Sequence, residues 1–270
     1  MRGGEGHNPR VQVAQGNLWY TDNQFESQLH QPGTRAVVEN RWSFFGEALG
    51  QFIAERRAGS NTRPLRLLDA GCGDGINLYG LSSRAHQEGW PLCLTGVDYN
   101  FLRVARAARI EGIEGVAHAD LMRLPFRDAA FDVVLCNHVL EHITEPLVIM
   151  KEIRRILHPD GILLLGVPNE GCLVGRLRNR FIQRSILKKT DHVNFYTAPS
   201  LFRIARNAGL LPERLGGGGI FFPHSGINTV LGRFEWGARL IMQLGRWCPS
   251  QSGDLLMAAR PETCAPRSVR

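Results

Sequence analysis

The chain has 270 residues, a hydrophobic fraction of 43% and a formal net charge of +7. This length is enough for one α/β domain with short extensions, and it holds no apolar run of the ~18 residues that a membrane-spanning helix needs. The positive charge is compatible with an anionic partner such as nucleic acid or lipid, and equally with a basic surface that binds neither.

Residues 1–16 are rich in glycine and polar side chains, and we expect a disordered tail there. They contain no apolar segment typical of a secretory signal, so we expect a cytoplasmic protein. The cysteines are scattered without a Cys-x-x-Cys pair, which argues against a zinc site or a disulfide framework. Residues 17–62 are expected to form a helical cap, because apolar side chains recur at helical spacing from residue 34 to residue 54.

A glycine-rich turn follows the first predicted strand. Residues 65–68 are apolar and predict a buried strand that ends near Asp69, and residues 76–84 predict a helix. The turn between them contains Gly71, Gly73 and Gly75. Glycine adopts a positive φ without steric penalty, so such a turn can approach a ligand closely. A strand, a glycine turn and a helix amino terminus together predict a cofactor site.

The spacing of these glycines differs from the dinucleotide fingerprint G-x-G-x-x-G, because position 76 is Ile. The carboxylates of Asp69 and Asp74 would repel a pyrophosphate, whereas a carboxylate can pair with a cationic amino acid group. The sequence D-x-G-x-G after a strand resembles motif I of the class I S-adenosylmethionine (SAM) dependent methyltransferases. This resemblance implies that SAM is the cofactor and that Asp69 and the three glycines bind it.

The second predicted strand, residues 92–97, leads directly to Asp98. An acid at this place, roughly 20 residues beyond the glycine turn, accepts hydrogen bonds from ribose hydroxyls in nucleotide-binding folds. The alternative is a helix cap, because residues 100–109 predict a helix. We expect Asp98 to bind the ribose and Tyr99 to lie beside it in the cofactor site.

The third predicted strand, residues 115–119, precedes Asp120 and Leu121. With Leu-Pro-Phe at residues 124–126, this segment resembles the adenine-binding part of the methyltransferases. The resemblance implies that Asp120 accepts from the adenine amine and that the main chain of Leu121 meets the ring edge. Residues 131–136 predict the fourth strand, and Asn137 at its end is expected in the cofactor site, since ligands bind at the carboxyl ends of such strands.

The alternating strands and helices predict an α/β fold, a Rossmann-like doubly wound sheet of seven strands, mostly parallel with an antiparallel last strand. Helices are predicted at residues 145–157 and 199–208, a tight turn at 158–161, and a flexible joint at the glycine run 216–219. The last three strands are predicted at residues 162–167, 211–216 and 254–259.

Residues 65–169 resemble the type 11 branch of the methyltransferases and, more loosely, the ubiquinone-type O-methyltransferases. We therefore expect a methyltransferase domain over residues 63–260, with a lid insertion at 170–197, an apolar insertion at 217–250 and a tail at 261–270. In this family the amino-terminal helices often cover the cofactor. Arg35 and Arg41 are therefore candidates to contact it or a substrate, and ordinary surface arginines are the alternative.

Histidine is a suitable general base because it can be neutral at working pH. Two histidines are the candidate catalytic bases: His138 is the better placed because it directly follows the fourth strand, and His192, on the expected lid, is the second. His138, Glu141 and His142 have a helical spacing that could also place metal ligands on one face. Some related O-methyltransferases carry Glu-x-x-Glu-His here, with a further histidine downstream in the region of His192. Because His138 replaces the first Glu and Mg²⁺ prefers oxygen ligands, we expect no metal.

Residues 173–189 mix Arg and Lys with apolar side chains and predict a basic amphipathic helix. It could contact an anionic membrane as a peripheral surface or close over the methyl acceptor, and an ordinary lid helix is the alternative. We expect the acceptor to be an oxygen of a small or lipid-like metabolite. Two alternatives stay open: an RNA methyltransferase that uses the basic helix on phosphates, and a catalytically silent SAM-fold binding protein. We expect nucleic acid not to be the partner.

Overall fold

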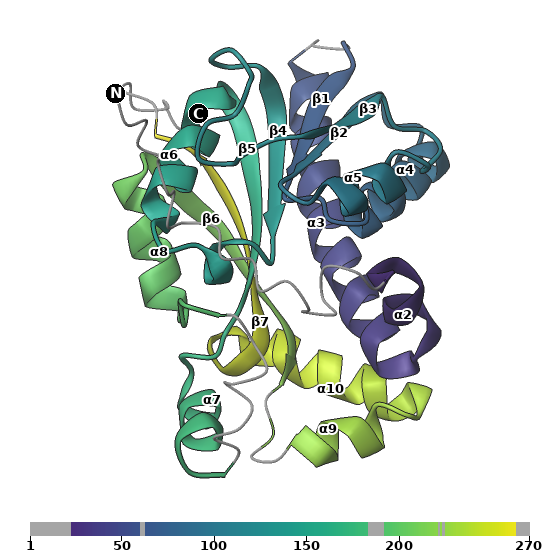
Figure 1. The fold of residues 1–270 in the computed structure, drawn as a ribbon, viewed down its shortest axis with the longest axis vertical. Coiled ribbons are helices and arrows are strands. Elements are labelled where there is room, and N and C mark those ends of the chain that lie inside the picture. Colours follow the sequence, from purple (N-terminus) through teal and green to yellow (C-terminus); the bar gives the residue numbers. More distant parts are fainter. Residues whose placement is uncertain (1–22, 60–62, 183–191, 221, 223–224, 263–270) are drawn as a thin grey trace, which may run out of the picture.

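The computed structural model describes residues 23–59, 63–182, 192–220, 222 and 225–262. They form one seven-stranded sheet with the order β3-β2-β1-β4-β5-β7-β6 (Figure 1). The strands are β1 Leu65–Ala70, β2 Leu92–Asp98, β3 Gly115–His118, β4 Phe131–Asn137, β5 Leu157–Pro168, β6 Leu210–Ile220 and β7 Ser252–Pro261. The first five strands pair in parallel, and β7 runs antiparallel to both β5 and β6. This confirms the predicted mostly parallel sheet with an antiparallel last strand.

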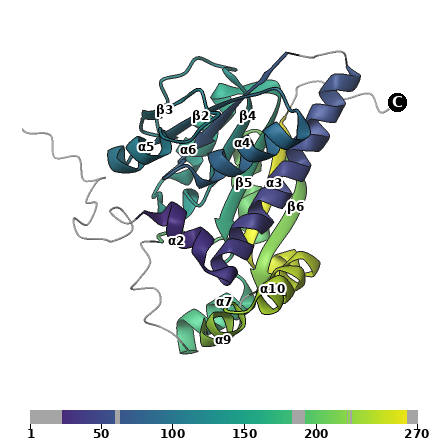
Figure 2. The same cartoon turned by 90° about the vertical axis from the view of Figure 1, so that its right-hand side faces the viewer.

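Helices cover both faces of the sheet. The bounds are α2 Gln24–His30, α3 Pro32–Ala58, α4 Ile76–Glu88, α5 Phe101–Ala107, α6 Pro146–Ile156, α7 Leu173–Leu177, α8 Ala198–Asn207, α9 Ser225–Leu231 and α10 Glu235–Trp247. The long helix α3 runs beside α4 and β6 on one face (Figure 2), and α6 packs with α8 on the other. The helix expected over residues 34–54 is therefore present and extends further at both ends.

Side chains of the central strands alternate between two apolar cores. In β4, Val133 and Leu135 face the core that α3 and α4 share, whereas Val134 and Cys136 face the core that contains α6 and α8. Alternation of this kind, with both sides buried, explains why the strand sequences are apolar throughout. Phe45 of α3 is fully buried, and such burial contributes roughly 2 kcal/mol for a large apolar side chain, so α3 is an integral layer of the core.

The predictions for two irregular segments are wrong. The glycine run 216–219 is not a flexible joint, because it lies inside β6 and pairs with β7. Backbone pairing needs no side chains, and Phe44 packs directly against Gly216. Residues 158–161 do not form a separate tight turn but belong to β5, whose register against β4 shifts between Phe131 and Val133. A local bulge accommodates these residues within the strand.

The basic helix expected over residues 173–189 is described only in part. Helix α7 ends at Leu177 and continues as a π-helical turn, Arg178–Ile182, while residues 183–189 lie outside the described residues. Of the tails expected at 1–16 and 261–270, residues 1–16 and 263–270 lie outside them as well, whereas Pro261 belongs to β7. Within the described part of the chain, every helix is too short or too polar to cross a bilayer.

Candidate active site

The glycine turn joins β1 to α4 at the carboxyl edge of the parallel strands. Its three glycines have φ values of 88°, 56° and 86°, a region that favours glycine. The backbone nitrogen of Gly71 donates to the carbonyl oxygen of Val97 at 2.8 Å, which ties the turn to β2. A Cβ on Gly71 would overlap the side chain of Val139, and one on Gly75 would overlap Ile110. The packing of Val139 and Ile110 therefore requires glycine at both positions.

Asp98 links the glycine turn to the start of α5. Its Oδ2 accepts a hydrogen bond from the nitrogen of Gly73 at 2.8 Å, and its Oδ1 accepts one from the nitrogen of Asn100 at 2.8 Å. Asn100, and not Asp98, is the residue that caps α5, because its side chain accepts from the nitrogens of Leu102 and Arg103. Asp98 is thus held in a fixed orientation between two turns.

Asp69 is a buried carboxylate at the end of β1. Neither of its oxygens has a hydrogen-bond partner among the described residues, and the same holds for Oδ1 of Asn137 at the end of β4. Burial, with a smaller contribution from Asp98, raises the pKa of Asp69 to about 8. A buried acceptor without a partner is costly, and a cationic ammonium group would satisfy it. The site therefore fits the amino acid part of SAM.

The remaining predicted cofactor residues lie at the same edge of the sheet. Tyr99 follows β2 with its side chain 48% exposed. Asp120 is exposed and its Oδ1 accepts from the nitrogen of Met122 at 2.9 Å. Leu121 is buried, and its Cδ1 would lie 3.6 Å from a Cβ on Gly71. The adenine segment expected from the sequence therefore packs against the glycine turn.

Asp74 has a different role from the one considered in the sequence. Its carboxylate lies 3.4 Å from Arg103 Nε and 3.2 Å from Arg106 Nη1, both on α5. These guanidinium groups neutralise it, so Asp74 does not contribute the repulsion of a pyrophosphate that its charge predicted.

A series of ion pairs surrounds His138. Arg41 of α3 donates from Nε to Oδ2 of Asp254 at 2.9 Å, and Oδ1 of Asp254 lies 3.4 Å from Nε2 of His138. Nδ1 of His138 lies 3.1 Å from Oε1 of Glu141. Burial and Arg41 oppose a charge on His138, but Asp254 and Glu141 outweigh them and raise its pKa. Both ring nitrogens of His138 therefore face carboxylates.

The backbone of His138 is also unusual. Its φ is 55°, a value that residues with a Cβ seldom adopt. The nitrogen of His138 donates to the carbonyl oxygen of Gly166 in β5 at 2.9 Å, which holds this conformation at the end of β4. Such local strain is found most often at functional sites.

His192 forms a second pair with Glu170, a residue that the sequence analysis missed. Nδ1 of His192 lies 3.1 Å from Oε2 of Glu170, and Nη2 of Arg178 lies 3.7 Å from Oε1. Burial opposes a charge on His192, but Glu170 outweighs it and raises the pKa of the imidazole. Glu170 follows the buried strand β5, so a polar residue directly after an apolar strand was the signal that could have revealed it.

The segment that carries His192 is fixed against the turn after β4. The nitrogen of Val193 donates to the carbonyl oxygen of Glu141 at 2.8 Å, and the side chain of Asn194 donates to the carbonyl oxygen of Leu140 at 3.1 Å. As a result the rings of His142 and His192 lie 5.0 Å apart.

Glu141, His142 and His192 each offer one ligand atom, and these atoms lie within 4.8 Å of one another. The metal-ligating trio considered from the sequence contained His138 in place of His192. Residues 140–142 form a 3-10 turn and not an α-helix, which explains the difference. Two imidazoles and one carboxylate are donors for Zn²⁺ or Mn²⁺ more than for Mg²⁺.

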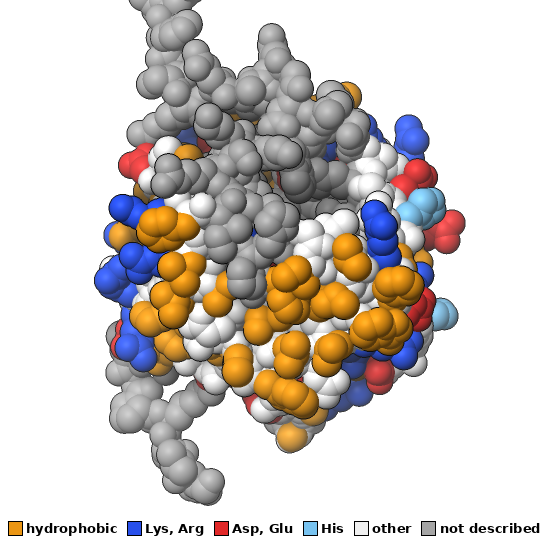
Figure 3. All heavy atoms as spheres, turned by 90° about the horizontal axis from the view of Figure 1, so that it is seen from below, with side chains coloured by type: hydrophobic (Ala, Val, Ile, Leu, Met, Phe, Trp, Pro, Cys, Tyr) orange, Lys and Arg blue, Asp and Glu red, His pale blue; other side chains and the backbone are white. Residues whose placement is uncertain are grey.

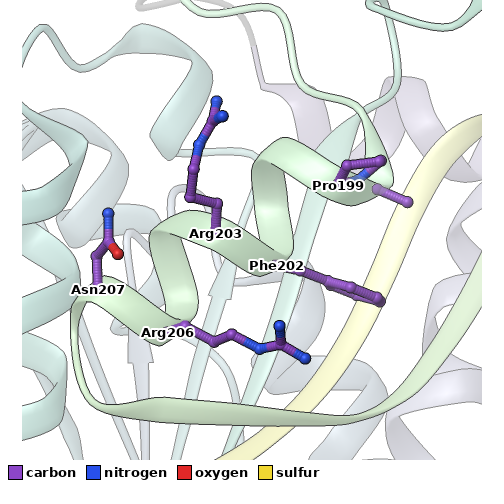
Figure 4. Close-up of a pocket in the computed structure, with 6 residues that line it drawn as sticks. Pro199, Phe202, Arg203, Arg206 and Asn207 are labelled. Carbon is purple, nitrogen blue, oxygen red and sulfur yellow. The ribbon is translucent and has the colours of Figure 1, made fainter.

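A cavity of about 800 Å³ lies next to these pairs. Asp254, Glu170 and Arg178 contribute to its polar side, and Ile241 and Met242 of α10 to its apolar side. A second hollow lies over α8 (Figure 4), where Pro199, Phe202, Arg203, Arg206 and Asn207 line it. That hollow is built from one helix and includes no member of the histidine pairs, whereas the first cavity includes their carboxylate partners Asp254 and Glu170, so the first cavity is the candidate acceptor site.

A family model described as a methyltransferase domain matches residues 41–213. The chain belongs to the class I SAM-dependent methyltransferases. This confirms the family and the cofactor that motif I implied. The matched residues include the glycine turn, Asp98, His138 and the pair of His192 with Glu170, whereas Asp254 lies beyond them.

Individual relatives are about one third identical to this chain or less over the aligned residues. It is 32% identical over 153 residues to a probable SAM-dependent methyltransferase of Mycolicibacterium smegmatis, covering 55% of each chain. It is 27% identical over 163 residues to the ubiquinone biosynthesis O-methyltransferase of Aeromonas salmonicida, covering 56% of this chain and 65% of the relative. The chain thus spans less than two thirds of the length of these curated relatives.

A solved structure shares the fold. A chain from the complex between the Haloferax volcanii Trm112 methyltransferase activator and a methyltransferase superposes with a TM-score of 0.57. The sequence identity is 19%, and the match covers 92% of this chain and 97% of that chain.

Proposed function

We propose that this methyltransferase methylates a hydroxyl oxygen of a small or lipid-like metabolite, with His192 as the general base. The observation that carries the proposal is the contact of 3.1 Å between Nδ1 of His192 and Oε2 of Glu170, since Glu170 also lines the candidate acceptor cavity. The similarity to a ubiquinone biosynthesis O-methyltransferase supports an oxygen acceptor on a ring or lipid-like molecule.

SAM, when bound, supplies a methyl group on an electrophilic sulfonium. The residues that would hold it are those of the glycine turn with Asp69, Asp98, Tyr99, Asp120, Leu121 and Asn137. Asp69 offers its unpartnered carboxylate to the ammonium group, and Asp98 offers its remaining lone pairs to the ribose. The glycine backbone lets the cofactor approach without a side chain between them.

Glu170 orients His192 for proton transfer. A carboxylate on Nδ1 favours the tautomer in which Nδ1 carries the proton and Nε2 can accept one. Nε2 then takes the proton of the acceptor hydroxyl as the oxygen gains the methyl group. The apolar wall of the cavity, with Ile241 and Met242, excludes water and suits an aromatic or isoprenoid acceptor.

His138 is proposed as a positioning residue and not as the base. Both of its nitrogens face carboxylates, Asp254 at 3.4 Å and Glu141 at 3.1 Å, whereas among the described residues His192 has a carboxylate within hydrogen-bond distance on Nδ1 alone. This reverses the order expected from the sequence, in which His138 came first because it directly follows β4.

The test uses transfer of labelled methyl from SAM to a panel of phenols and hydroquinones. We expect His192→Gln to lower kcat by roughly 10²–10⁴-fold while SAM binding in calorimetry is unchanged. The matched control is His86→Gln, which alters an exposed histidine on α4. Equal kcat for wild type and His192→Gln would overturn the assignment of the base. Transfer to RNA with none to phenols would instead favour the RNA alternative.

A further inference from the structure

Helix α10 exposes large apolar side chains on its outer side, beside the exposed Arg239 and Arg246. Its inner side is small and apolar, with Ala238 and Ile241 buried, whereas on its outer side Trp236 is 61% exposed and Trp247 is 70% exposed. Leu240, also on the outer side, is 47% exposed. A helix that covers a globular core normally turns polar side chains to water, so the outer side of α10 is adapted to another environment.

Neighbouring segments extend this apolar area. Helices α7, α9 and α10 all lie at the lower end of the molecule in Figure 1, and Figure 3 views that end, where hydrophobic side chains spread across the face. The exposed apolar residues contributed by α7, its π-helical turn and the α9–α10 segment are Leu173, Leu177, Phe181, Ile227, Val230 and Phe234. We call these residues, with Trp236, Leu240 and Trp247, the aromatic surface.

The charged residues around the aromatic surface are mainly basic. Exposed arginines on the same helices and the joining segments are Arg176, Arg180, Arg233, Arg239 and Arg246. Glu235 is the acidic residue in the sequences of α7, α9 and α10, and it is paired with Arg35 at 2.6 Å and with Arg239 at 3.3 Å. The surface therefore carries an excess of positive charge. In Figure 3, Lys and Arg side chains border the hydrophobic area on two sides.

The aromatic surface and the candidate acceptor cavity lie on opposite sides of α10. The buried side of this helix lines the cavity with Ala238, Ile241 and Met242, and the α9–α10 junction lines it with Gly232 and Arg233. One helix thus separates the cavity from the aromatic surface.

We propose that the aromatic surface docks onto an anionic lipid bilayer, with Trp236 and Trp247 in the interfacial layer and the arginines on lipid phosphates. Charge complementarity selects this occupant, because an apolar face bordered by arginine and poor in acids matches a negatively charged membrane surface. Tryptophan favours the boundary between acyl chains and headgroups. The proposal concerns the docking surface and holds whichever acceptor the enzyme methylates.

The experiment is sedimentation of the full chain with phosphatidylcholine vesicles, with and without phosphatidylglycerol. We expect binding to the anionic vesicles, weaker binding to the neutral ones, and a loss on raising the salt concentration. Trp236→Ser/Trp247→Ser is expected to lower the partition coefficient by about tenfold or more. Arg176→Gln/Arg239→Gln is expected to remove the preference for anionic lipid.

The matched control is Leu211→Ser, which changes a 41% exposed leucine at the other end of the molecule. Leu211 pairs with Arg260 of β7, and Arg260 contacts Glu55 near the end of α3, whereas α10 contacts Arg35 near the start of that helix. Circular dichroism and SAM titration verify that each variant is folded.

Two results would overturn the proposal. One is that folded protein fails to sediment with anionic vesicles at low salt, or that the tryptophan variant sediments as well as wild type. The other is a dimer in light scattering that Trp236→Ser/Trp247→Ser dissociates, because a second copy would then cover the aromatic surface.

Discussion

The carboxylate of Asp98 and the backbone nitrogen of Gly73 are joined by a hydrogen bond of 2.8 Å. The residue proposed to bind the ribose therefore also fixes the glycine turn that would lie beneath the amino acid part of SAM. Because its other oxygen holds the nitrogen of Asn100, one side chain sets the positions of two loops. Loss of this side chain should therefore weaken SAM binding in two ways: the ribose loses a hydrogen-bond acceptor, and the glycine turn becomes less ordered.

Asp98→Ala is expected to weaken SAM binding by about tenfold to a hundredfold, because charge-assisted hydrogen bonds are each worth roughly 1.5–3 kcal/mol. Isothermal titration calorimetry measures this, with Asp128→Ala as a control at an exposed carboxylate. We expect no binding of NAD to either protein. An unchanged SAM affinity in Asp98→Ala would refute the ribose role.

Asp69 should couple SAM binding to the release of a proton. Its pKa of about 8 means that the free protein holds this proton at neutral pH, and pairing with an ammonium group requires the carboxylate. Titration in buffers of different ionisation enthalpy should therefore show proton release near pH 7. Asp69→Asn should bind more weakly and release no proton. Identical proton release in the variant would assign it to another group.

The same group gives a pH dependence of stability in the free protein. An unfolded Asp has a pKa of about 3.9, so between about pH 4 and pH 8 the folded state binds the proton that the unfolded state has lost. The free energy of unfolding should consequently fall as pH rises through this window. Thermal melting at several pH values checks this, and Asp69→Asn should show a smaller slope.

Glu170 should set the pH dependence of catalysis. The raised pKa of His192 predicts that kcat increases with pH and reaches half its limit above the ordinary histidine value of about 6.5. Glu170→Gln removes the charge that favours the imidazolium, so the inflection should move to lower pH while the limiting kcat falls. Glu111→Gln, an exposed carboxylate, should keep the wild-type profile. An inflection that stays in place in Glu170→Gln would contradict the pairing.

Asp132 stabilises the fold away from the site. Its buried carboxylate accepts from Arg63 at 2.5 and 2.8 Å and from the nitrogen of Arg66 at 3.0 Å. Asp132→Asn should lower the free energy of unfolding by about 3 kcal/mol at pH 7, because the neutral amide no longer pairs with the guanidinium group of Arg63. Burial opposes the charge, but Arg63 outweighs it and lowers the pKa of Asp132, so this stabilisation is present above about pH 4 and lost in acid. Urea unfolding of wild type, Asp132→Asn and the surface control Asp128→Asn measures it. A difference that persists unchanged at acid pH would show that packing and not charge is responsible.

Much of the fold was predictable because its signals are local. Apolar runs bounded by turn residues located the strands, and motif I placed Asp69, the glycines and Asp98 at one edge of the sheet within a short stretch of chain. The backbone contact between Gly73 and Asp98 spans only 25 residues. Such short-range arrangements follow from the order of strand, turn and helix.

The histidine pairs depend on contacts between distant segments. Arg41 and Asp254 are separated by 213 residues, and their pairing requires α3 and β7 to meet beside β4. Glu170 reaches His192 because the segment around Val193 is bonded to the turn at Glu141. Composition and periodicity carry no information on such pairings, which explains why Glu170 and Asp254 were missed.

The glycine run in β6 determines how the candidate acceptor site can change. A Cβ on Gly217 would overlap the carbonyl oxygen of Gly245 in α10, and a Cβ on Gly245 would overlap that of Gly219, so strand and helix meet backbone to backbone. Mutational tolerance on this wall is therefore uneven. Drift or directed evolution towards larger or smaller acceptors should accumulate substitutions at Ile241 and Met242. Gly217 of β6 should be retained, because a side chain there would overlap α10.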